Sequence, residues 1–473
     1  MVDNKIVVCP ICNKRTWLRI QNGAYLRQYP IRINCINCRA LIKGTYRISM
    51  RTGRGELHLL NAAIEECDAH LIDEKTVKVF NADYVAEISG ELPCDNVKIY
   101  DGGNIPRSPY MKAVDKLESV DERIERLQYF VNNRSDWTKK KSIAFQLLNE
   151  GSIDYIAMAL DSRMGTYHYQ CNHYLQSLHC LQEVVLEETK YLFHDLCQDE
   201  CIMNLLMELS NTDQNLLQQF SAEVGGTQGL LLAYRKAIEV FTGFMDIYPN
   251  LLPAETFMRF KNQNTDNIGI STCSYSDIKT FYQDGYEALL SLIHFPVCLD
   301  NISARGDYLM FPKAFNGLFK SRKYEDCSND LQKYILLENG NKVKNLRWEE
   351  PMQKIVDIPA NRFLRNGIGH NNIRYDGITQ TIQILDQRNS NEVFQELKLM
   401  DMAIDCIGLA KSAVLISEII LFMLRQEFRK EGIRSIMHPR FYRNAEPNDR
   451  CPCGSSYKYK RCCRSDVERV VQC

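Results

Sequence analysis

A short stretch of the sequence combines an arginine, an asparagine and a histidine. Residues 362–372 read RFLRNGIGHNN, so Arg365, Asn366 and His370 fall within two helical turns. Histidine, with an ordinary pKa of about 6.5, can accept or donate a proton near neutral pH, and arginine offers a fixed fork of donors to phosphate oxygens. Cleavage of RNA by its own 2′-hydroxyl needs a proton acceptor, a proton donor and a cation, and it needs no metal. Asn366 could position the arginine, the histidine or the phosphate.

Two glycines, Gly367 and Gly369, lie between these polar residues. Glycine weakens a helix interior by about 1 kcal/mol relative to alanine, so their presence needs a reason. One interpretation is that they let an RNA backbone approach closely. The other is a helix C-cap, in which Gly367 or Gly369 adopts a left-handed conformation and His370 lies just past the last turn. The two interpretations are compatible.

Eight of the 19 cysteines form two clusters with metal-ligand spacing, one near each end of the chain. The first, with the pattern C-x2-C-x22-C-x2-C, consists of Cys9, Cys12, Cys35 and Cys38. The residues between its two pairs alternate apolar and polar side chains, as short strands do. Two C-x2-C knuckles on adjacent hairpins bring four thiolates into a tetrahedron, so the pattern predicts a zinc ribbon with one structural Zn²⁺.

A third group of histidines and cysteines lies between residues 168 and 201. Its members are His168, Cys171, His173, His179, Cys180, His194, Cys197 and Cys201. Their spacings match no ligand pattern, and long aromatic-rich helices collect such residues by chance. We expect core packing here, with a metal site as the alternative. The cysteines outside the two clusters are interpreted as small buried hydrophobes.

The net charge of −1 conceals an uneven distribution. Residues 1–55 contain eleven Lys/Arg and one acidic residue, and residues 429–464 contain ten Lys/Arg and three acidic residues, so the middle of the chain is acidic. Basic ends with interspersed aromatic residues are typical of proteins that bind polyanions. The candidate RNA contacts are Arg15, Arg19, Arg27, Lys458 and Lys460. The alternative is that these charges balance the −2 that four thiolates leave around one Zn²⁺.

Hydrophobic periodicity predicts strands up to about residue 104 and helices after it. The expected helices are an amphipathic helix over 114–131, a helix that stops near Pro249, a helix from a Ser/Asp cap to Pro296, a helix over 351–366 with an interruption at Pro359, and a last helix over 391–430. The region from about 222 to 430 is therefore expected to be helical throughout. The polar stretch at 300–351 is expected to be an insertion or a long connection.

The sequence predicts no membrane association. It contains no run of ~20 apolar residues, which a membrane span would need, and the segment SAVLISEIILFMLR is interrupted by Glu418 and reads as a buried helix. The N-terminus lacks the pattern of a secretory signal peptide. We therefore expect a cytoplasmic protein.

The motif R-x4-H, with Asn366 directly after the arginine, resembles the active motif of HEPN-domain ribonucleases. The following stretch NNIRYDGITQTIQ and the apolar helix after it are similar to that family's layout. The resemblance implies a metal-independent endoribonuclease of the bacterial toxin or abortive-infection type, active in anti-phage defence or growth arrest. It also implies a homodimer in which Arg365, Asn366 and His370 of two chains form one composite catalytic site. Some relatives carry a tyrosine two residues after the histidine, which an antitoxin modifies, but here that residue is Asn372.

The C-terminal stretch PNDRCPCGSSYKYKRCC resembles the SEC-C motif, a small zinc-binding module found in many bacterial proteins. The resemblance implies that one Zn²⁺ is held by Cys451, Cys453, Cys462 and Cys463. In relatives, a polar partner is faced by the residues that correspond to Ser455, Tyr457, Lys458 and Lys460; the alternative is that these residues are only a solvated surface. The chain has no G-x4-G-K-[ST] phosphate loop, so we expect a docking module for protein, ribosome or RNA.

The predicted fold class is mainly α: a helical HEPN bundle with a small N-terminal β zinc ribbon, a strand-rich segment and a short C-terminal SEC-C module. The predicted domains are a zinc ribbon (1–60), a β-rich extension (61–105), a helical middle region (106–221), a HEPN-like helical domain (222–432) and the SEC-C motif (445–465). The expected cofactors are two structural Zn²⁺, with none for catalysis. The expected partners are an RNA substrate, a second copy of the chain, and a phage-derived trigger or protein bound through the zinc modules.

Two other functions remain open at this point. The first is a non-catalytic adaptor that binds RNA or protein through its zinc modules. The second is a zinc-dependent hydrolase, which would need an open coordination position for a water molecule and a nearby carboxylate. Because both clusters are complete four-cysteine sets, the sequence favours structural zinc over catalytic zinc.

Overall fold

A computed structural model describes most of the chain, which is mostly helical. The described residues are 2–21, 28–49, 51–52, 54–65, 142–160, 173–193, 200–259, 268–311, 330–344, 350–386, 392–433, 439–455 and 457–471, with short stretches between 76 and 129 and at 163–164, 167–168, 346 and 436. The chain divides into two compact units, each built from three segments. Unit 1 consists of Met1–Arg134, Phe244–Gln283 and Phe363–Ile407, and unit 2 of Ser135–Gly243, Asp284–Arg362 and Gly408–Cys473.

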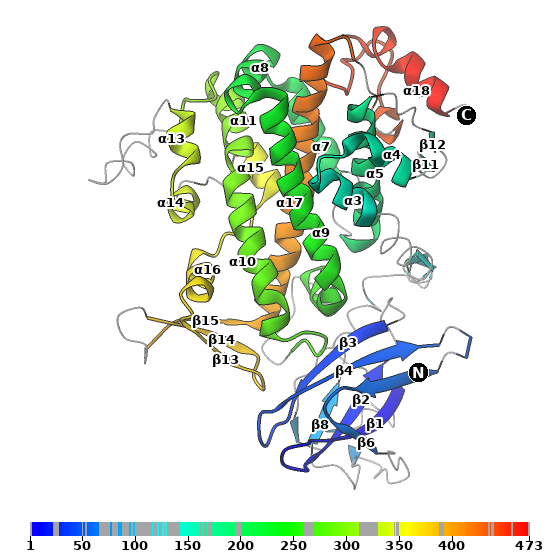
Figure 1. The fold of residues 1–473 in the computed structure, drawn as a ribbon, viewed down its shortest axis with the longest axis vertical. Coiled ribbons are helices and arrows are strands. Elements are labelled where there is room, and N and C mark those ends of the chain that lie inside the picture. The colour runs from blue at the N-terminus through cyan, green and yellow to red at the C-terminus, as the bar shows by residue number, and fades with distance from the viewer. Residues whose placement is uncertain are drawn as a thin grey trace. The chain divides into compact units, whose positions relative to one another are not determined.

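Unit 1 begins with two small sheets (Figure 1). The first has the order β6-β1-β2-β8-β9 and is antiparallel except for the parallel pair β2–β8; its strands are β1 (Val2–Val8), β2 (Arg15–Gln21), β6 (Ala63–Glu65), β8 (Tyr84–Glu87) and β9 (Cys94–Asp95). The second is the antiparallel sheet of β3 (Gln28–Asn34), β4 (Leu41–Ile48) and β5 (Gly55–Leu59). Alternate side chains of these strands, such as Leu18 and Ile20 or Ile31 and Ile33, form one buried cluster. The strands predicted between the two cysteine pairs are confirmed.

A third sheet follows the Arg–His motif within unit 1. Helix α16 (Arg362–Gly369) leads into the antiparallel sheet of β13 (Ile373–Asp376), β14 (Thr381–Leu385) and β15 (Val393–Lys398). The Arg39 guanidinium lies 3.1 Å from the Asp376 carboxylate, which joins this sheet to the N-terminal strands. A Cβ at Gly377 would lie 2.5 Å from Nδ2 of Asn34, so the β13–β14 turn packs directly against the end of β3. The first zinc-ligand cluster and the hairpin that follows the motif are therefore neighbours.

The same strands also contact the helical part of unit 1. The Arg32 N–H donates to the Ser271 carbonyl at 2.7 Å, and its guanidinium lies 3.0 Å from Asp277, which caps the start of α10 (Tyr275–Leu292) through the Ser274 N–H. The Gln380 side chain both donates to and accepts from the backbone of Ile270 at 2.8 Å. These bonds hold β3 and the third sheet against one helical segment.

Unit 2 is helical with a C-terminal knuckle. Its helices, wholly or in part, are α3 (Ser142–Asn149), α4 (Ile156–Ala159), α5 (Tyr174–Leu192), α7 (Glu200–Asn211), α8 (Gln214–Glu223), α9 (Gly226–Arg259), α10, α11 (His294–Arg305), α13 (Leu331–Ile335), α14 (Asn339–Lys344), α15 (Pro351–Val356), α17 (Leu399–Lys430) and α18 (Arg464–Val471). The central apolar residues come from α17, and a buried chain of hydrogen bonds joins Tyr234, Gln182 and Ser417 at 2.8 and 3.0 Å. Among the described residues, each unit also has one pair of two-residue strands: β7 (Thr76–Val77) with β10 (Lys98–Ile99) in unit 1, and β11 (Arg163–Met164) with β12 (Tyr167–His168) in unit 2.

The mainly α fold class is confirmed, with small N-terminal sheets, but some predicted helix bounds are wrong. Helix α9 continues through Pro249 and Pro253 to Arg259. Pro249 and Pro253 each cost about 3 kcal/mol inside a helix, and the buried Tyr248, Leu251 and Leu252 offset this cost by about 1.5–3 kcal/mol each. Burial of this segment therefore balances the lost helical hydrogen bonds. Likewise α10 ends at Leu292, and Pro296 lies near the start of α11 rather than ending a helix.

The prediction of helices throughout 222–430 is also wrong. Residues 373–376, 381–385 and 393–398 form β13, β14 and β15, so the last helix begins at Leu399 rather than at 391. The alternating burial along β14 explains this, since one face of the strand is covered while the other is open. The interruption expected at Pro359 within 351–366 is present, since α15 and α16 are separated by residues 357–361. The helix expected over 114–131 lies largely outside the described residues.

One described helix, α17, is long and apolar enough by composition to cross a membrane. Of its most apolar window, 89% is buried inside the protein, and Glu418 within it is buried as well. A core helix passes the same test of length and composition, so this is weak support for a membrane span. The prediction that SAVLISEIILFMLR forms a buried helix is confirmed.

Candidate functional site

Helix α16 carries the arginine and the asparagine of the motif on its last two turns. The Arg365 Nη1 donates to Oδ1 of Asn366 at 3.1 Å, so the asparagine side chain holds the guanidinium. The His370 N–H donates to the Asn366 carbonyl at 2.9 Å, which places the histidine directly after the helix and four residues from Asn366 on the same face. Arg365 and Asn366 are half-buried and His370 is exposed. A phosphate that reached this helix end would meet the guanidinium, an amide and an imidazole.

The helix end is a Schellman cap built on Asn371. The Asn372 N–H donates to the Gly367 carbonyl at 2.8 Å and the Asn371 N–H to the Ile368 carbonyl at 3.2 Å, which is the hydrogen-bond pair of that cap. Asn371 has the left-handed conformation, with φ of 56°. The expectation that Gly367 or Gly369 adopts it is therefore wrong. Asparagine can replace glycine at this position because it tolerates positive φ better than most residues.

The two glycines have different surroundings. A Cβ at Gly367 would lie 3.2 Å from side-chain carbons of Ile373 and Ile384, so glycine lets α16 pack closely on β13 and β14. A Cβ at Gly369 would meet only Nη1 of Arg365 at 3.8 Å and Nε2 of Gln283 at 4.0 Å, which are ordinary contacts. Packing explains Gly367. It does not explain Gly369, whose exposed surface lies beside the Arg365 guanidinium.

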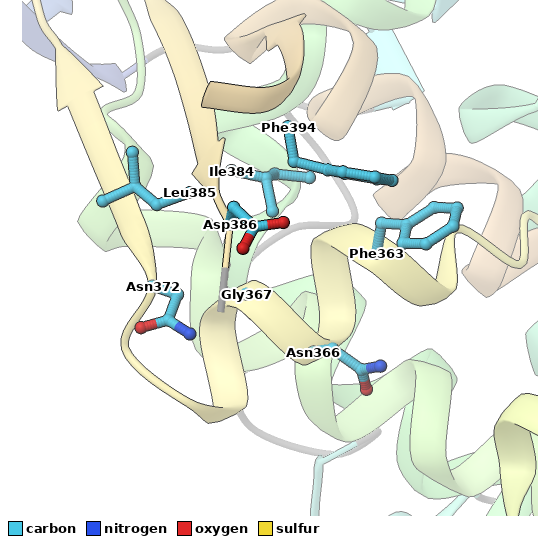
Figure 2. A pocket seen from close by; sticks show the side chains of 8 residues that line it. All are labelled: Phe363, Asn366, Gly367, Asn372, Ile384, Leu385, Asp386 and Phe394. Atoms are coloured by element: carbon cyan, nitrogen blue, oxygen red, sulfur yellow. The ribbon is translucent and has the colours of Figure 1, made fainter. Parts of the chain in front are cut away.

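A pocket of about 360 Å³ lies beside the motif, between α16 and the third sheet (Figure 2). Its lining residues are Phe363, Asn366, Gly367, Asn372, Ile384, Leu385, Asp386 and Phe394. Of the three predicted catalytic residues, Asn366 lines it. Because Asn366 also binds Arg365, the pocket and the motif share one residue.

The first cysteine cluster is built from two matching knuckles. Each C-x2-C pair lies between two paired strands, β1–β2 or β3–β4, and the residue after each second cysteine, Asn13 or Arg39, has positive φ. In both knuckles the N–H of that residue donates to the carbonyl of the first cysteine, at 3.0 and 2.8 Å. The backbone hydrogen bond at Lys14 lowers the pKa of Cys12 to about 6, whereas burial raises the pKa of Cys35 to about 12.

The sulfur positions of this cluster fit a zinc ion. All four Sγ atoms lie within 4.8 Å of one another, with Cys9–Cys38 at 3.4 Å and Cys12–Cys35 at 3.6 Å. Four sulfurs at about 2.3 Å from a tetrahedral Zn²⁺ are about 3.8 Å apart. The cluster of Cys9, Cys12, Cys35 and Cys38 therefore fits a structural zinc site.

The second cluster fits a zinc ion equally well. The Sγ atoms of Cys451, Cys453, Cys462 and Cys463 also lie within 4.8 Å of one another. Cys462 lies 3.4 Å from Cys453 and 3.7 Å from Cys463, and the Ser455 hydroxyl lies 3.1 Å from the Cys462 sulfur. The predicted pair of structural zinc sites is confirmed in this sense. Ser455 faces the sulfurs, whereas Tyr457, Lys458 and Lys460 are exposed.

Helix α17 provides the support for the second cluster. The Gln426 side chain donates to the Cys453 carbonyl at 3.1 Å. Gly454 has φ of 76°, and a Cβ there would overlap the Phe422 ring, so both its conformation and its space require glycine. Burial would lower the pKa of Arg429, but the charge of Cys453 and a hydrogen bond to it raise that pKa above its usual value. Arg429 thus offsets part of the negative charge of the thiolates.

A second pocket, of about 650 Å³, adjoins this cluster within unit 2. Its lining residues are Gln214, Gln218, Gln426, Arg429, Lys430, Gly432, Gly454, Ser455, Tyr457, Arg461 and Cys462. Arg429, Lys430 and Arg461 are its cationic residues, and Cys462 belongs to the thiolate cluster. Lys430 is paired with Glu427 at 2.9 Å, and Arg461 is exposed.

The remaining predicted residues lie in varied surroundings. Arg15 is paired with Glu65 at 2.9 Å, and Arg19 is 1% exposed with its guanidinium 5.5 Å from the centre of the Trp17 ring. Burial of Arg19 speaks against a direct RNA contact there, whereas the Arg15 side chain is 43% exposed and its RNA contact stays a prediction. Lys458 and Lys460 are exposed. Arg27 lies outside the described residues.

The described members of the 168–201 group lie apart from any metal-like cluster. His179 is buried, its Nδ1 lies 3.0 Å from the Ile436 carbonyl, and burial and Arg425 lower its pKa to about 3. His173 caps α5 by accepting the Leu175 N–H at 3.1 Å, and Cys180 is buried. Among the described residues, the groups that could hold a metal are the two four-cysteine clusters. Cys171, His194 and Cys197 lie outside the described residues.

The comparisons with known proteins identify one segment of the chain. Residues 448–465 match the family model of the SEC-C motif. The segment contains a SEC-C motif. Its four cysteines are the second cluster described above. The comparison with curated proteins and the comparison with solved structures each returned no match. The resemblance of the 222–432 region to HEPN ribonucleases stays a prediction.

The sequence reasoning missed the pocket beside the motif. Phe363 is adjacent to the motif, but Asp386 and Phe394 belong to a hairpin that was expected to be helical. The signal that could have found them is the alternation in TIQIL, which predicts a strand and therefore a sheet next to the motif. Arg429 was counted as part of a basic end, although its place one turn after Arg425 on an apolar helix could have suggested a buried role.

Proposed function

We propose that the protein is an endoribonuclease that needs no metal for catalysis and uses Arg365, Asn366 and His370. The observation that carries the proposal is the helix end itself: the guanidinium and the asparagine amide are joined at 3.1 Å, and the exposed imidazole follows on the same face. Its resemblance to the HEPN motif R-x4-H supports the same assignment. The proposed setting is bacterial growth arrest or anti-phage defence in the cytoplasm.

The proposed reaction is attack of an RNA 2′-hydroxyl on the adjacent phosphate. His370 takes the 2′-hydroxyl proton or donates one to the departing 5′-oxygen, and Arg365 stabilises the charge on the phosphate oxygens. The P–O5′ bond breaks as the P–O2′ bond forms, which leaves a 2′,3′-cyclic phosphate and a 5′-hydroxyl. Asn366 positions the guanidinium through the hydrogen bond already described.

A single chain contributes one histidine to a reaction that needs both an acceptor and a donor. We therefore propose a homodimer in which the motifs of two chains form one composite site, as the family resemblance implies. The mass of the protein in solution, measured at the concentration used for cleavage, tests this. A strict monomer with full activity would rule out the composite site.

The deciding experiment is cleavage of total cellular RNA and purified tRNA without added Mg²⁺. The wild-type protein is compared with His370→Ala and with Arg365→Lys, which keeps the charge but loses the fork of donors. We expect cleavage to fall by at least about 100-fold in His370→Ala, because general acid–base catalysis contributes about that much. A fully active and folded His370→Ala protein would refute the proposal.

The second candidate is a non-catalytic adaptor that binds RNA or protein through the zinc modules. The pocket of about 650 Å³ beside the second cluster favours it, because three cationic side chains, Arg429, Lys430 and Arg461, line that pocket and Arg461 is exposed. An adaptor would bind RNA with the same affinity in wild type and His370→Ala, would lose affinity in Arg461→Ala, and would leave the RNA intact.

A further inference from the structure

The pocket beside α16 combines features that recognise one part of a nucleotide. Phe363 and Phe394 are 36% and 54% exposed, and among the described phenylalanines these two are the exposed ones. Their ring centres are 4.8 Å apart, so they form one aromatic surface at the pocket. Large aromatic side chains that stay in contact with solvent commonly mark binding surfaces, and unstacked RNA bases stack on them.

Polar groups complete the lining opposite this surface. Figure 2 shows the two rings on one side, Asn372 on the other and the Asp386 carboxylate between them. Ile384 and Leu385 supply apolar surface, and Gly367 contributes only backbone. The volume of about 360 Å³ lies at the lower end of the range for small-ligand pockets, which suits one base rather than a large cofactor.

We propose that this pocket binds a guanine base of the RNA substrate; the proposal rests on the proposed ribonuclease function and gives it a sequence preference. A carboxylate accepts hydrogen bonds only. Guanine presents two adjacent donors, N1–H and the N2 amino group, on the edge that pairs in a duplex, and its O6 is an acceptor. The Asp386 carboxylate matches the two donors, and the Asn372 amide can donate to O6.

The other bases match this lining less well. Adenine and cytosine place a ring nitrogen acceptor beside their amino group, and uracil flanks its single N–H with two carbonyl oxygens. Each would put an acceptor against the Asp386 carboxylate, which cannot donate. Two acceptors that face each other without a proton between them repel, so this mismatch discriminates against adenine, cytosine and uracil.

The position of the pocket connects base binding to cleavage. Asn366 lines the pocket and accepts the hydrogen bond from Arg365, so a base in the pocket brings its own phosphates toward the guanidinium. The exposed surface of Gly369, where a Cβ would approach Nη1 of Arg365 at 3.8 Å, leaves space on the same helix end. The structure assigns Asp386 and Asn372 to base recognition, and Phe363 and Phe394 to stacking.

The test is calorimetric titration of the full-length protein with 3′-GMP, 3′-AMP, 3′-CMP and 3′-UMP. We expect 3′-GMP to bind at least about tenfold more tightly than the others, since hydrogen bonds to a charged group carry that much discrimination. Asp386→Asn should remove the preference. The matched control is Glu396→Gln, an exposed carboxylate of β15 that accepts from Gln383 at 2.7 Å and is not part of the pocket lining.

Phe394→Ala provides a second measurement, because it changes stacking and leaves the polar lining in place. It should weaken all four nucleotides without changing their order. Equal affinity for the four nucleotides in wild type, or an unchanged preference in Asp386→Asn, would overturn the assignment. So would a Phe394→Ala protein that loses its dimer but keeps its nucleotide affinity, because the aromatic pair would then be a contact between two chains.

His370→Ala separates this assignment from the catalytic proposal. The preference for 3′-GMP over the other three nucleotides should be the same in His370→Ala as in wild type, while cleavage is lost; a weaker contact to the 3′-phosphate would lower all four affinities alike. RNA cleaved without preference at guanine, together with equal nucleotide affinities, would refute the base pocket alone. Preferred binding of 3′-GMP by a protein that cleaves no RNA would support the pocket and refute the nuclease.

Discussion

The two clusters each have four cysteine ligands, but different structural elements support them. In the N-terminal cluster the support is the backbone of two matching knuckles between paired strands, with Asn13 and Arg39 in the left-handed conformation. In the C-terminal cluster it is a helix, whose Gln426 and Arg429 side chains reach the ligand residue Cys453. Two zinc sites with four cysteine ligands each can therefore stabilise different parts of a fold.

The neighbours of the clusters differ as well. The knuckle that contains Cys35 and Cys38 contacts the β13–β14 turn through Arg39 and Asn34, and β13 follows directly on α16. The C-terminal cluster belongs to the other unit and packs on α17. Loss of the first metal should disturb the Arg–His motif, and loss of the second should not.

The largest effect is expected from removing one ligand of each cluster. Structural Zn²⁺ binding contributes about 10–16 kcal/mol in small zinc modules, which is comparable to the whole stability of a domain. We expect Cys35→Ala to reduce the zinc content from two ions per chain to one and to unfold the sheets of unit 1, with loss of RNA cleavage. Cys453→Ala should also leave one ion but retain cleavage, and only the tail after α17 should become sensitive to protease.

Zinc is measured by mass spectrometry of the metal, and order by hydrogen exchange of residues 373–398. Equal protection of this segment in Cys35→Ala and Cys453→Ala would show that the difference between the clusters has no consequence for the motif. A wild-type zinc content of three ions per chain would indicate a further site in the 168–201 group. A zinc content of zero would refute both predicted sites.

The sequence predicted the two clusters because metal ligation restricts residue type and spacing so tightly. It also predicted the strands that position the first cluster, since they alternate in the ordinary way around Leu18 and Ile31. It did not predict the sheet after α16. There the alternation of apolar and polar residues is confined to a few positions, and the apolar residues of the following helix suggested that the helix begins earlier.

The pocket beside α16 could not be predicted from the sequence for a different reason. Phe363 and Phe394 are 31 positions apart and meet only because α16 packs on the third sheet. The position of the left-handed residue in the cap is likewise set by where α16 ends. That residue is Asn371 and not one of the nearby glycines. Burial that depends on contacts between distant segments carries no local signature.

A smaller effect is expected from alanine at the two glycines of α16. At Gly367 a Cβ would press on Ile373 and Ile384, and overpacking of this kind costs about 1–3 kcal/mol, against a gain of up to about 1 kcal/mol in helix propensity. Gly367→Ala should therefore lower the free energy of unfolding of unit 1 and loosen the hairpin that joins α16 to the first cluster. Gly369→Ala meets no close contact and should leave stability equal or slightly higher.

Denaturant unfolding of both variants provides the stability comparison, and RNA cleavage provides the functional one. If the space at Gly369 admits substrate, Gly369→Ala will be as stable as wild type and yet cleave more slowly. Unchanged cleavage in that variant would assign the glycine no role in substrate approach. Equal stability losses in the two variants would contradict the difference in their surroundings.

The smallest effect is expected at the ion pair between Arg39 and Asp376, which ties the first cluster to the hairpin. The Arg39 side chain is 70% exposed, so solvent screens the pair and Arg39→Ala should cost less than about 1 kcal/mol.

Partial burial of Asp376 would raise its pKa, but backbone N–H groups of Ile378 and Thr379, together with Arg39, lower it below its ordinary value. A carboxyl whose pKa is lowered by folding stabilises the folded state above its unfolded pKa of about 4, and this contribution is lost as the pH falls through the lower, folded value. The difference in unfolding free energy between wild type and Arg39→Ala should therefore be present at pH 7 and shrink on acidification below about pH 4, while Arg39→Lys retains most of it. A difference that persists unchanged in acid would mean that Arg39 acts through the backbone conformation of its knuckle, and the contact between cluster and hairpin would then depend on the packing of Asn34 against Gly377.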